Sequence, residues 1–246
     1  MENFIKKISN AISLMLLFIL SAVFYFSAKG FVVENGQIVL KEQIAHADEI
    51  KNGIAMVVSK NININANSRY AIGAENAPLT LYEYSSFGCP HCADFHLNEI
   101  PKLQEDFVNN GLLKIVFVSF PLDKKSMKGT MLAHCMTYDN YHNFIYTLFD
   151  RQRRWFLASD DTPLFKFAAE YGLSYDEAQN CIRDDNVASE IIADRQQAIA
   201  QLKMEGTPAL LISGPDGNEV IYGKPRYSDL RDYLNKRLAD LNYVRQ

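Results

Sequence analysis

Two cysteines separated by only two residues, Cys89 and Cys92, constrain the fold of this chain more than any other feature. Residues 79–84 precede them with an alternating pattern rich in strand-forming side chains, which predicts a strand. Pro90 can occupy the first turn of a helix because its missing N–H has no partner there in any case. Pro101 is then expected to kink or restart the helix. The sequence thus predicts a strand, a turn and a helix, with Cys89 as the helix N-cap.

This spacing predicts redox chemistry. Residues three apart on a helix have Cβ atoms about 5 to 6 Å apart, which is close enough for a disulfide after a small adjustment. At the helix start, unpaired backbone N–H groups and the positive end of the helix dipole stabilise a thiolate on Cys89, and a protonated His91 adds a cation. Cys92 lies one turn inside the helix, where it is shielded. We expect Cys89 to react with substrates and Cys92 to resolve, and the polar Pro90-His91 pair to favour oxidation of other proteins.

Other roles for the two cysteines agree less well with the sequence. A structural zinc site requires a second pair of ligands, and the candidates, His134, Cys135, His142 and Cys181, are scattered along the chain. Covalent haem attachment requires a histidine where this chain has Ala93. A purely structural disulfide across so short a loop would stabilise little. No metal site is therefore expected, and the other histidines are interpreted as ordinary helix residues.

The remaining pattern gives the order of elements. Residues 112–120 are a second strand, which completes a βαβ unit. The segment 123–204 has apolar residues at helical spacing throughout. Residues 207–212 and 220–222 read as two strands joined by a tight turn, and 227–241 read as a final helix. The chain is therefore of the α/β class, with a helical segment between its βαβ and ββα parts.

The N-terminal segment indicates export. Lys6 and Lys7 precede an uncharged apolar run at residues 11–28, so residues 1–30 are interpreted as a signal peptide or an uncleaved membrane anchor. Residues 31–69 are weakly patterned and are interpreted as a linker or N-terminal extension, with a short strand or an oligomerising stalk as alternatives.

Charge and cysteine content agree with an exported protein. The net charge of -4 gives no basic field that would attract nucleic acid. Four cysteines in a translocated domain indicate a compartment where disulfides persist. We expect Cys135 and Cys181 to be bonded to each other, with two buried free thiols as the alternative. Closing that loop would stabilise the fold by about 4 kcal/mol in the chain-entropy model.

Residues 83–92, which contain Cys-Pro-His-Cys, together with the later Gly-Thr-Pro at 206–208, resemble the DsbA family of bacterial disulfide oxidoreductases. The resemblance runs from about Ile72 to the end of the chain. It implies a thioredoxin fold with a mixed central sheet and an inserted all-helical domain. The thioredoxin-like domain would then comprise residues 70–122 and 205–246, and the inserted helical domain residues 123–204.

The resemblance also implies roles for three more residues. Glu83 matches the buried acid of the family, which can relay the proton of the resolving cysteine, whereas on an alternating strand it could instead face solvent. Thr207 and Pro208 match the cis-proline segment that faces the disulfide and offers backbone groups to an extended substrate. The alternative is an ordinary trans proline at a strand start.

The function implied is donation of a disulfide to folding exported polypeptides in the periplasm. Reoxidation would come from a DsbB-like membrane protein that uses quinone, and the chain itself would need no cofactor. Two alternatives remain open. The chain could be an isomerase or reductase of the same fold, oligomerised through residues 31–69, or a chaperone-like binder of unfolded polypeptide in which the thiols are incidental.

Overall fold

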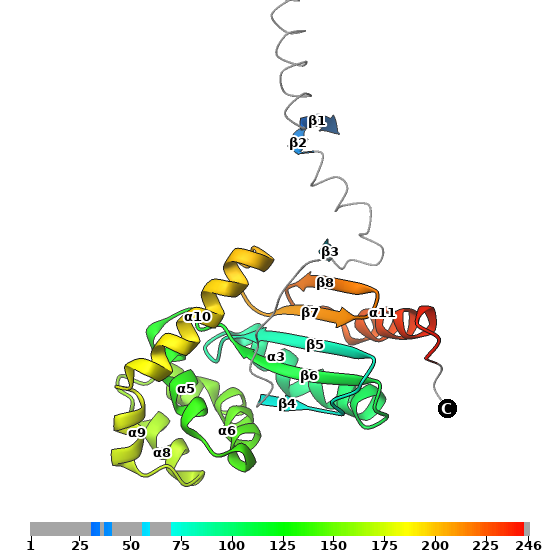
Figure 1. The fold of residues 1–246 in the computed structure, drawn as a ribbon. Coiled ribbons are helices and arrows are strands. Elements are labelled where there is room, and N and C mark those ends of the chain that lie inside the picture. The colour runs from blue at the N-terminus through cyan, green and yellow to red at the C-terminus, as the bar shows by residue number, and fades with distance from the viewer. Residues whose placement is uncertain (1–30, 35–36, 41–55, 60–69, 244–246) are drawn as a thin grey trace, which may run out of the picture. The chain divides into compact units, whose positions relative to one another are not determined.

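A computed structural model describes residues 31–34, 37–40, 56–59 and 70–243 of the chain (Figure 1). The predicted signal or anchor at residues 1–30 lies outside the described residues. Within the described segments, no helix is long and apolar enough to cross a membrane.

The chain divides into two compact units, residues 1–51 and 52–246. In the first unit, strands β1 (Phe31–Glu34) and β2 (Gln37–Leu40) pair antiparallel. All elements of the predicted redox domain belong to the second unit.

The second unit is built on a six-stranded sheet with the order β3-β8-β7-β5-β6-β4 (Figure 1). Strands β5 and β6 are parallel, and every other neighbouring pair in this sheet is antiparallel, so the predicted mixed sheet is confirmed. The strands are β3 (Met56–Ser59), β4 (Ala71–Ile72), β5 (Leu79–Ser85), β6 (Leu113–Ser119), β7 (Ala209–Gly214) and β8 (Gly217–Tyr222).

The sequence pattern did not predict that the two edge strands, β3 and β4, belong to this sheet. β4 has two residues, too few to show an alternating pattern, and is defined by its pairing with β6. β3 lies in the weakly patterned segment, for which a short strand was one of several readings, and pairs with β8. Strand pairing across many residues is a tertiary property that local periodicity does not report.

Alternation along β5 determines what each face of the sheet carries. Leu79 and Leu81 belong to the larger buried core on one face, and Glu83 has the same parity. Tyr84 belongs to a second core on the opposite face, and Tyr82 packs against it. A carboxyl group at position 83 therefore points toward the face with the larger core.

Ten helical segments are described in the second unit. They are α3 (Pro90–Asn98), α4 (Ile100–Leu103), the π-helix η2 (Gln104–Val108), α5 (Lys124–Cys135), α6 (Tyr138–Asp150), α7 (Gln152–Phe156), α8 (Thr162–Glu170), α9 (Tyr175–Cys181), α10 (Asp185–Leu202) and α11 (Tyr227–Asp240). The expected restart of the helix at Pro101 is confirmed, because α4 begins one residue before that proline.

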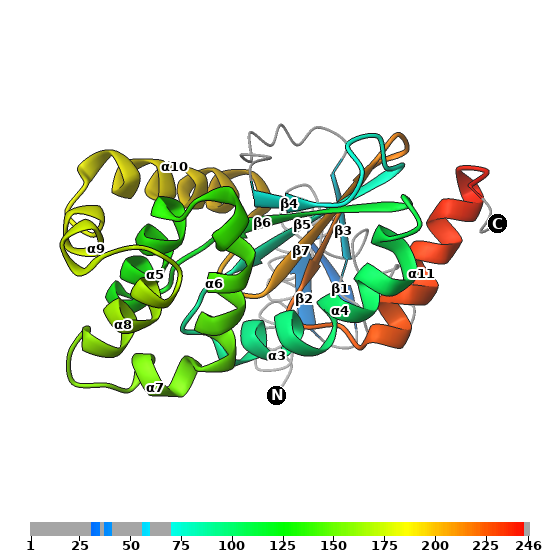
Figure 2. The same ribbon diagram turned by 90° about the horizontal axis from the view of Figure 1, so that it is seen from below.

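Two helices of the thioredoxin-like part, α3 and α11, cover the face with the larger core, and the C-terminal end of α10 covers the other (Figure 2). On α10, Ala198 and Leu202 pack into the core that contains Tyr84. Both faces are thus closed by helices, which explains why β5 and β6 are buried along most of their lengths.

The helical segment shares its core with the sheet. Leu132 of α5, Phe144 of α6 and Trp155 of α7 belong to the same buried cluster as Leu81 of β5 and Phe95 of α3. Burying each such side chain contributes about 1.5 to 3 kcal/mol. The inserted helices therefore stabilise, and are stabilised by, the part of the chain that carries the cysteine pair.

Candidate functional site

The cysteine pair lies at the start of α3. Cys89 is the N-cap residue of this helix, with extended backbone angles, and Pro90 opens the first turn. Both Cys89 and Cys92 are free thiols, and both are buried. The local placement expected from the spacing is therefore confirmed, and the two sulfurs belong to one helical turn.

The environment of Cys89 favours its thiolate. The hydrogen bond from the Cys92 thiol is the largest influence and lowers the pKa of Cys89 to about 5, although burial opposes it. The Thr207 side chain and the backbone N–H groups of Cys92 and His91 lower it further. At neutral pH the reduced Cys89 is therefore almost entirely ionised, which is the reactive form of a cysteine.

Cys92 has the opposite environment. Burial is the largest influence and raises its pKa above the ordinary value of a cysteine, and the hydrogen bond with Cys89 acts in the same direction. A sulfur in this position holds its proton when reduced, so it must lose a proton before it attacks and gain one after it leaves. The two cysteines are thus chemically distinct, as expected from the helix geometry.

Thr207 and Pro208 lie beside the pair. The peptide bond between them is cis, and the Cys89 sulfur lies 3.4 Å from the Thr207 carbonyl oxygen. A cavity of about 520 Å³ opens here, lined by Lys203, Glu205, Gly206, Thr207, Pro208, Tyr222 and Gly223. An extended peptide placed there would lie against the segment that contacts Cys89.

The helical segment holds the loop that leads to Cys89. The amide of Gln152 donates to the Phe87 carbonyl oxygen at 2.8 Å and to the Cys89 carbonyl oxygen at 3.0 Å. The Ser126 hydroxyl accepts from the Gly88 N–H at 3.0 Å. Neither Gln152 nor Ser126 was singled out from the sequence, since nothing in the pattern around either residue indicates contact with a loop far away in the chain.

Gly88 allows this close approach. A Cβ atom at this position would lie 2.4 Å from the Phe156 ring and 2.5 Å from Ser126 Oγ. Ser126 is itself fixed, because its hydroxyl donates to the Asp123 carboxylate at 2.6 Å and Asp123 caps α5. Any side chain at position 88 would separate the loop from the helices that hold it.

Glu83 is completely buried, so it does not face solvent. The Ser85 hydroxyl donates to its Oε1 at 2.7 Å, and its Oε2 lies 3.5 Å from Nδ1 of His96 on α3. The carboxyl group is therefore beneath the helix that carries the cysteine pair, and it is paired with a histidine to which the sequence interpretation assigned no role.

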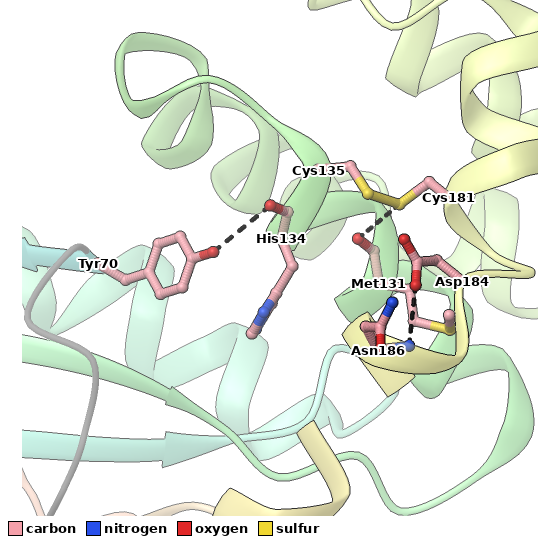
Figure 3. Close-up of a disulfide and its surroundings, with 7 residues drawn as sticks. All are labelled: Tyr70, Met131, His134, Cys135, Cys181, Asp184 and Asn186. Atoms are coloured by element: carbon pink, nitrogen blue, oxygen red, sulfur yellow. Dashed lines mark hydrogen bonds between the residues drawn. A yellow bond between two sulfur atoms is a disulfide. The ribbon is translucent and has the colours of Figure 1, made fainter. Parts of the chain in front are cut away.

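The sulfurs of Cys135 and Cys181 are bonded to each other, and link the end of α5 to the end of α9 (Figure 3). The Cys181 sulfur lies 3.0 Å from the Met131 carbonyl oxygen. These cysteines are thus separate from the pair on α3. In the described ranges, no group of three or more His, Cys, Asp or Glu side chains could hold a metal ion.

Comparisons with known proteins agree with this geometry. The disulfide bond formation protein D of Bacillus subtilis is 22% identical over 175 residues, covering 68% of this chain and 76% of that protein. A Rickettsia typhi relative, whose name describes a protein-disulfide oxidoreductase, is 24% identical over 153 residues; the match covers 60% of this chain and 56% of the length of that relative.

Solved structures show the same fold. Wolbachia pipientis alpha-DsbA1 is 29% identical with a TM-score of 0.62, covering 68% of this chain and 89% of that one. BdbD from Bacillus subtilis in its oxidised form has a TM-score of 0.60 at 19% identity, covering 74% of this chain and all of that one. The thioredoxin fold with an inserted helical segment, expected from the resemblance to DsbA, is therefore confirmed.

The thioredoxin family model matches residues 65–236. This range includes the cysteine pair, the cis-proline segment and all the helices from α3 to α10. The chain therefore belongs to the thioredoxin family.

Proposed function

We propose that this protein is an exported thiol–disulfide oxidoreductase that donates its Cys89–Cys92 disulfide to folding polypeptides. The observation that carries the proposal is a free cysteine pair at the start of α3, where the environment lowers the pKa of Cys89 to about 5 and raises that of Cys92. A stabilised thiolate favours the reduced form of the pair, which makes its disulfide a stronger oxidant. The names of the DsbA-like relatives support the same reaction class.

The exchange proceeds in two steps. A substrate thiolate attacks the Cys89 sulfur, a mixed disulfide forms, and the bond to Cys92 breaks, so that the Cys92 sulfur leaves and takes up a proton. A second substrate thiolate then attacks the substrate sulfur of the mixed disulfide, and Cys89 leaves as a thiolate. The substrate loses two electrons and two protons as its disulfide forms. The protein gains both electrons and one proton, which Cys92 holds, and the second proton goes to solvent because Cys89 remains a thiolate.

The neighbouring groups fit these steps. Because the Cys89 thiolate is stable, it is a good leaving group in the second step. Because Cys92 is buried and unfavourable as a thiolate, the first step requires a proton donor, and we assign this role to Glu83. The backbone at Thr207 and Pro208 would pair with an extended substrate in the adjoining cavity.

The proposal extends to the cellular setting. The chain would act in the periplasm, where disulfides form and persist, and would be reoxidised by a DsbB-like membrane protein that passes the two electrons to quinone. The predicted export segment at residues 1–30 supports this location.

A redox titration of the purified protein in glutathione buffers tests the proposal, with the Cys89–Cys92 pair followed by mass after thiol alkylation. A potential near about -120 mV is expected of a donor, whereas a value of about -180 mV or lower would indicate an isomerase or reductase. A pair that does not titrate would leave polypeptide binding as the function. The Cys89→Ser variant should lose all exchange activity, and retention of activity would contradict the mechanism.

A further inference from the structure

Glu83 and His96 are buried facing each other between β5 and α3. Glu83 Oε2 lies 3.5 Å from His96 Nδ1, and the two side chains are 0% and 7% exposed. Neither atom has a hydrogen-bond partner within the described residues. A buried donor or acceptor that is left unpaired destabilises the folded state. A small rotation of either group would let the imidazole N–H donate to the carboxylate and satisfy both.

The surroundings of this pair are mostly aromatic and apolar, apart from polar groups such as the Ser85 hydroxyl that donates to Glu83 Oε1. The imidazole ring lies 5.3 Å from the ring of Phe117 and 4.7 Å from that of Phe149, measured between centroids. The adjoining cavity has a volume of about 10 Å³, close to the space that one water molecule requires. In such an environment an interaction between a carboxyl group and an imidazole is screened much less than at the surface.

Two other titratable groups lie close by on α6. Burial holds the pKa of Tyr141 well above its ordinary value, with Tyr70 and Glu83 contributing, so Tyr141 stays a neutral phenol. Burial lowers the pKa of His142, and the charge of His96 acts in the same direction, so His142 stays neutral at neutral pH. Of the described residues lining the cavity, His96 is the one that can bring a positive charge to Glu83.

His96 also connects Glu83 with the reacting sulfur. It follows Cys92 by four residues on α3, and residues at this spacing lie on the same face of a helix. Cys92 and His96 are both buried toward the sheet, on the side that Glu83 faces. The carboxyl group on β5 thus meets the helix one turn beyond the resolving cysteine.

We propose that His96 is a positioning residue for Glu83 that holds the carboxyl group where it can exchange a proton with Cys92. As the bond between Cys89 and Cys92 breaks, the carboxyl group gives its proton to the Cys92 sulfur, and the carboxylate that results is held by the His96 N–H. In the reverse direction the carboxylate accepts the proton of Cys92 before it attacks. The inference rests on the proposed function, because it assigns His96 to the same exchange step.

The test measures how fast Cys92 resolves a mixed disulfide between Cys89 and glutathione in the full chain. Glutathione release is followed by mass across a pH series in the wild type, Glu83→Gln, His96→Gln and the double variant. Each single substitution should slow release at neutral pH by at least about tenfold and change the pH profile. The double variant should release glutathione at a rate within about twofold of the slower single variant. If the two residues act as a unit, removing the second one has little further effect once the first is gone.

His142→Gln is the matched control, since it replaces a neighbouring half-buried histidine that does not pair with Glu83. It should leave the rate and the pH profile unchanged. The inference would be overturned if the double variant slowed glutathione release by the product of the two single effects. It would also be overturned if the pH profile of His96→Gln were identical to that of the wild type.

A spectroscopic readout covers the case in which His96→Gln does not fold. The imidazole nitrogen NMR signals of His96 must differ between the wild type and Glu83→Gln, and identical signals would overturn the inference. If wild-type Cys92 does not release glutathione at all, the proposed function fails instead, so the two failures are distinguishable.

Discussion

The acidity of Cys89 depends most strongly on the hydrogen bond from its partner thiol, and this dependence can be tested by two substitutions at position 92. Cys92→Ala removes the donor, whereas Cys92→Ser keeps a hydroxyl donor of similar size. A hydrogen bond to a charged group contributes about 1.5 to 3 kcal/mol. Its loss should therefore weaken the acidity of Cys89 about tenfold to a hundredfold, since 1.4 kcal/mol corresponds to a factor of ten.

The expected result is a titration midpoint near pH 5 in the reduced wild type, a similar midpoint in the serine variant, and a midpoint moved clearly toward neutral pH in the alanine variant. The ultraviolet absorbance of the thiolate, recorded against pH, gives all three midpoints. The rate of alkylation against pH gives an independent measure, because only the thiolate reacts.

Two outcomes would refute the reasoning. If the alanine and serine variants titrate together near pH 5, the backbone N–H groups at the start of α3 are sufficient and the thiol donor is not needed. If the reduced wild type titrates at the ordinary pH of a cysteine, the helix start does not stabilise the thiolate, and the case for an oxidising pair weakens with it.

Three further results are expected. Because folding depresses the pKa of Cys89 to about 5, the reduced protein gains stability as the pH rises from about 5 toward the ordinary pKa of a cysteine, and loses it as the pH falls back through 5. Over this range, urea unfolding should show the free energy of unfolding of the reduced form rising relative to that of the oxidised form, and a constant difference between the two forms would contradict this. Replacing Cys135 and Cys181 together by alanine should lower the free energy of unfolding by about 4 kcal/mol, given their separation of 46 residues, and a urea midpoint equal to that of the wild type would exclude this estimate. Gly88→Ala should impair disulfide exchange and lower thermal stability, because its Cβ would collide with the Phe156 ring; normal values for both would show that the loop can move aside.

The sequence predicted the local helices and strands better than it predicted contacts between distant parts of the chain. The boundaries of β5, β6 and α11 agree with the expected segments within one or two residues, and α3 begins at Pro90 as expected, because each is encoded by a local pattern of apolar spacing, proline position or turn residues. The N-cap position of Cys89 follows from the same local signals. Edge strands β3 and β4 do not, since their pairing partners are distant in the chain.

The residues around the cysteine pair show the same division. Glu83 and Thr207 were identified through a resemblance, whereas Gln152, Ser126 and His96 were missed. A glutamine on a helix, a serine near a cap and a histidine inside a helix are common features, and nothing in their neighbourhoods distinguishes these three from others of their type. Their importance arises from contact with groups that are remote in the sequence.

The sequence by itself determined the reactive pair and its position at a helix start, because these properties depend on groups within one turn of helix. The burial that raises the pKa of Cys92 comes from the tertiary structure. Only the tertiary structure decided that Gln152 of the helical segment hydrogen-bonds to the loop before Cys89, and that the Thr207 carbonyl oxygen contacts the Cys89 sulfur. It also decided that the buried acid is paired with His96. Those contacts depend on how β5, α3 and the inserted helices pack together, and packing brings together side chains that no local pattern relates.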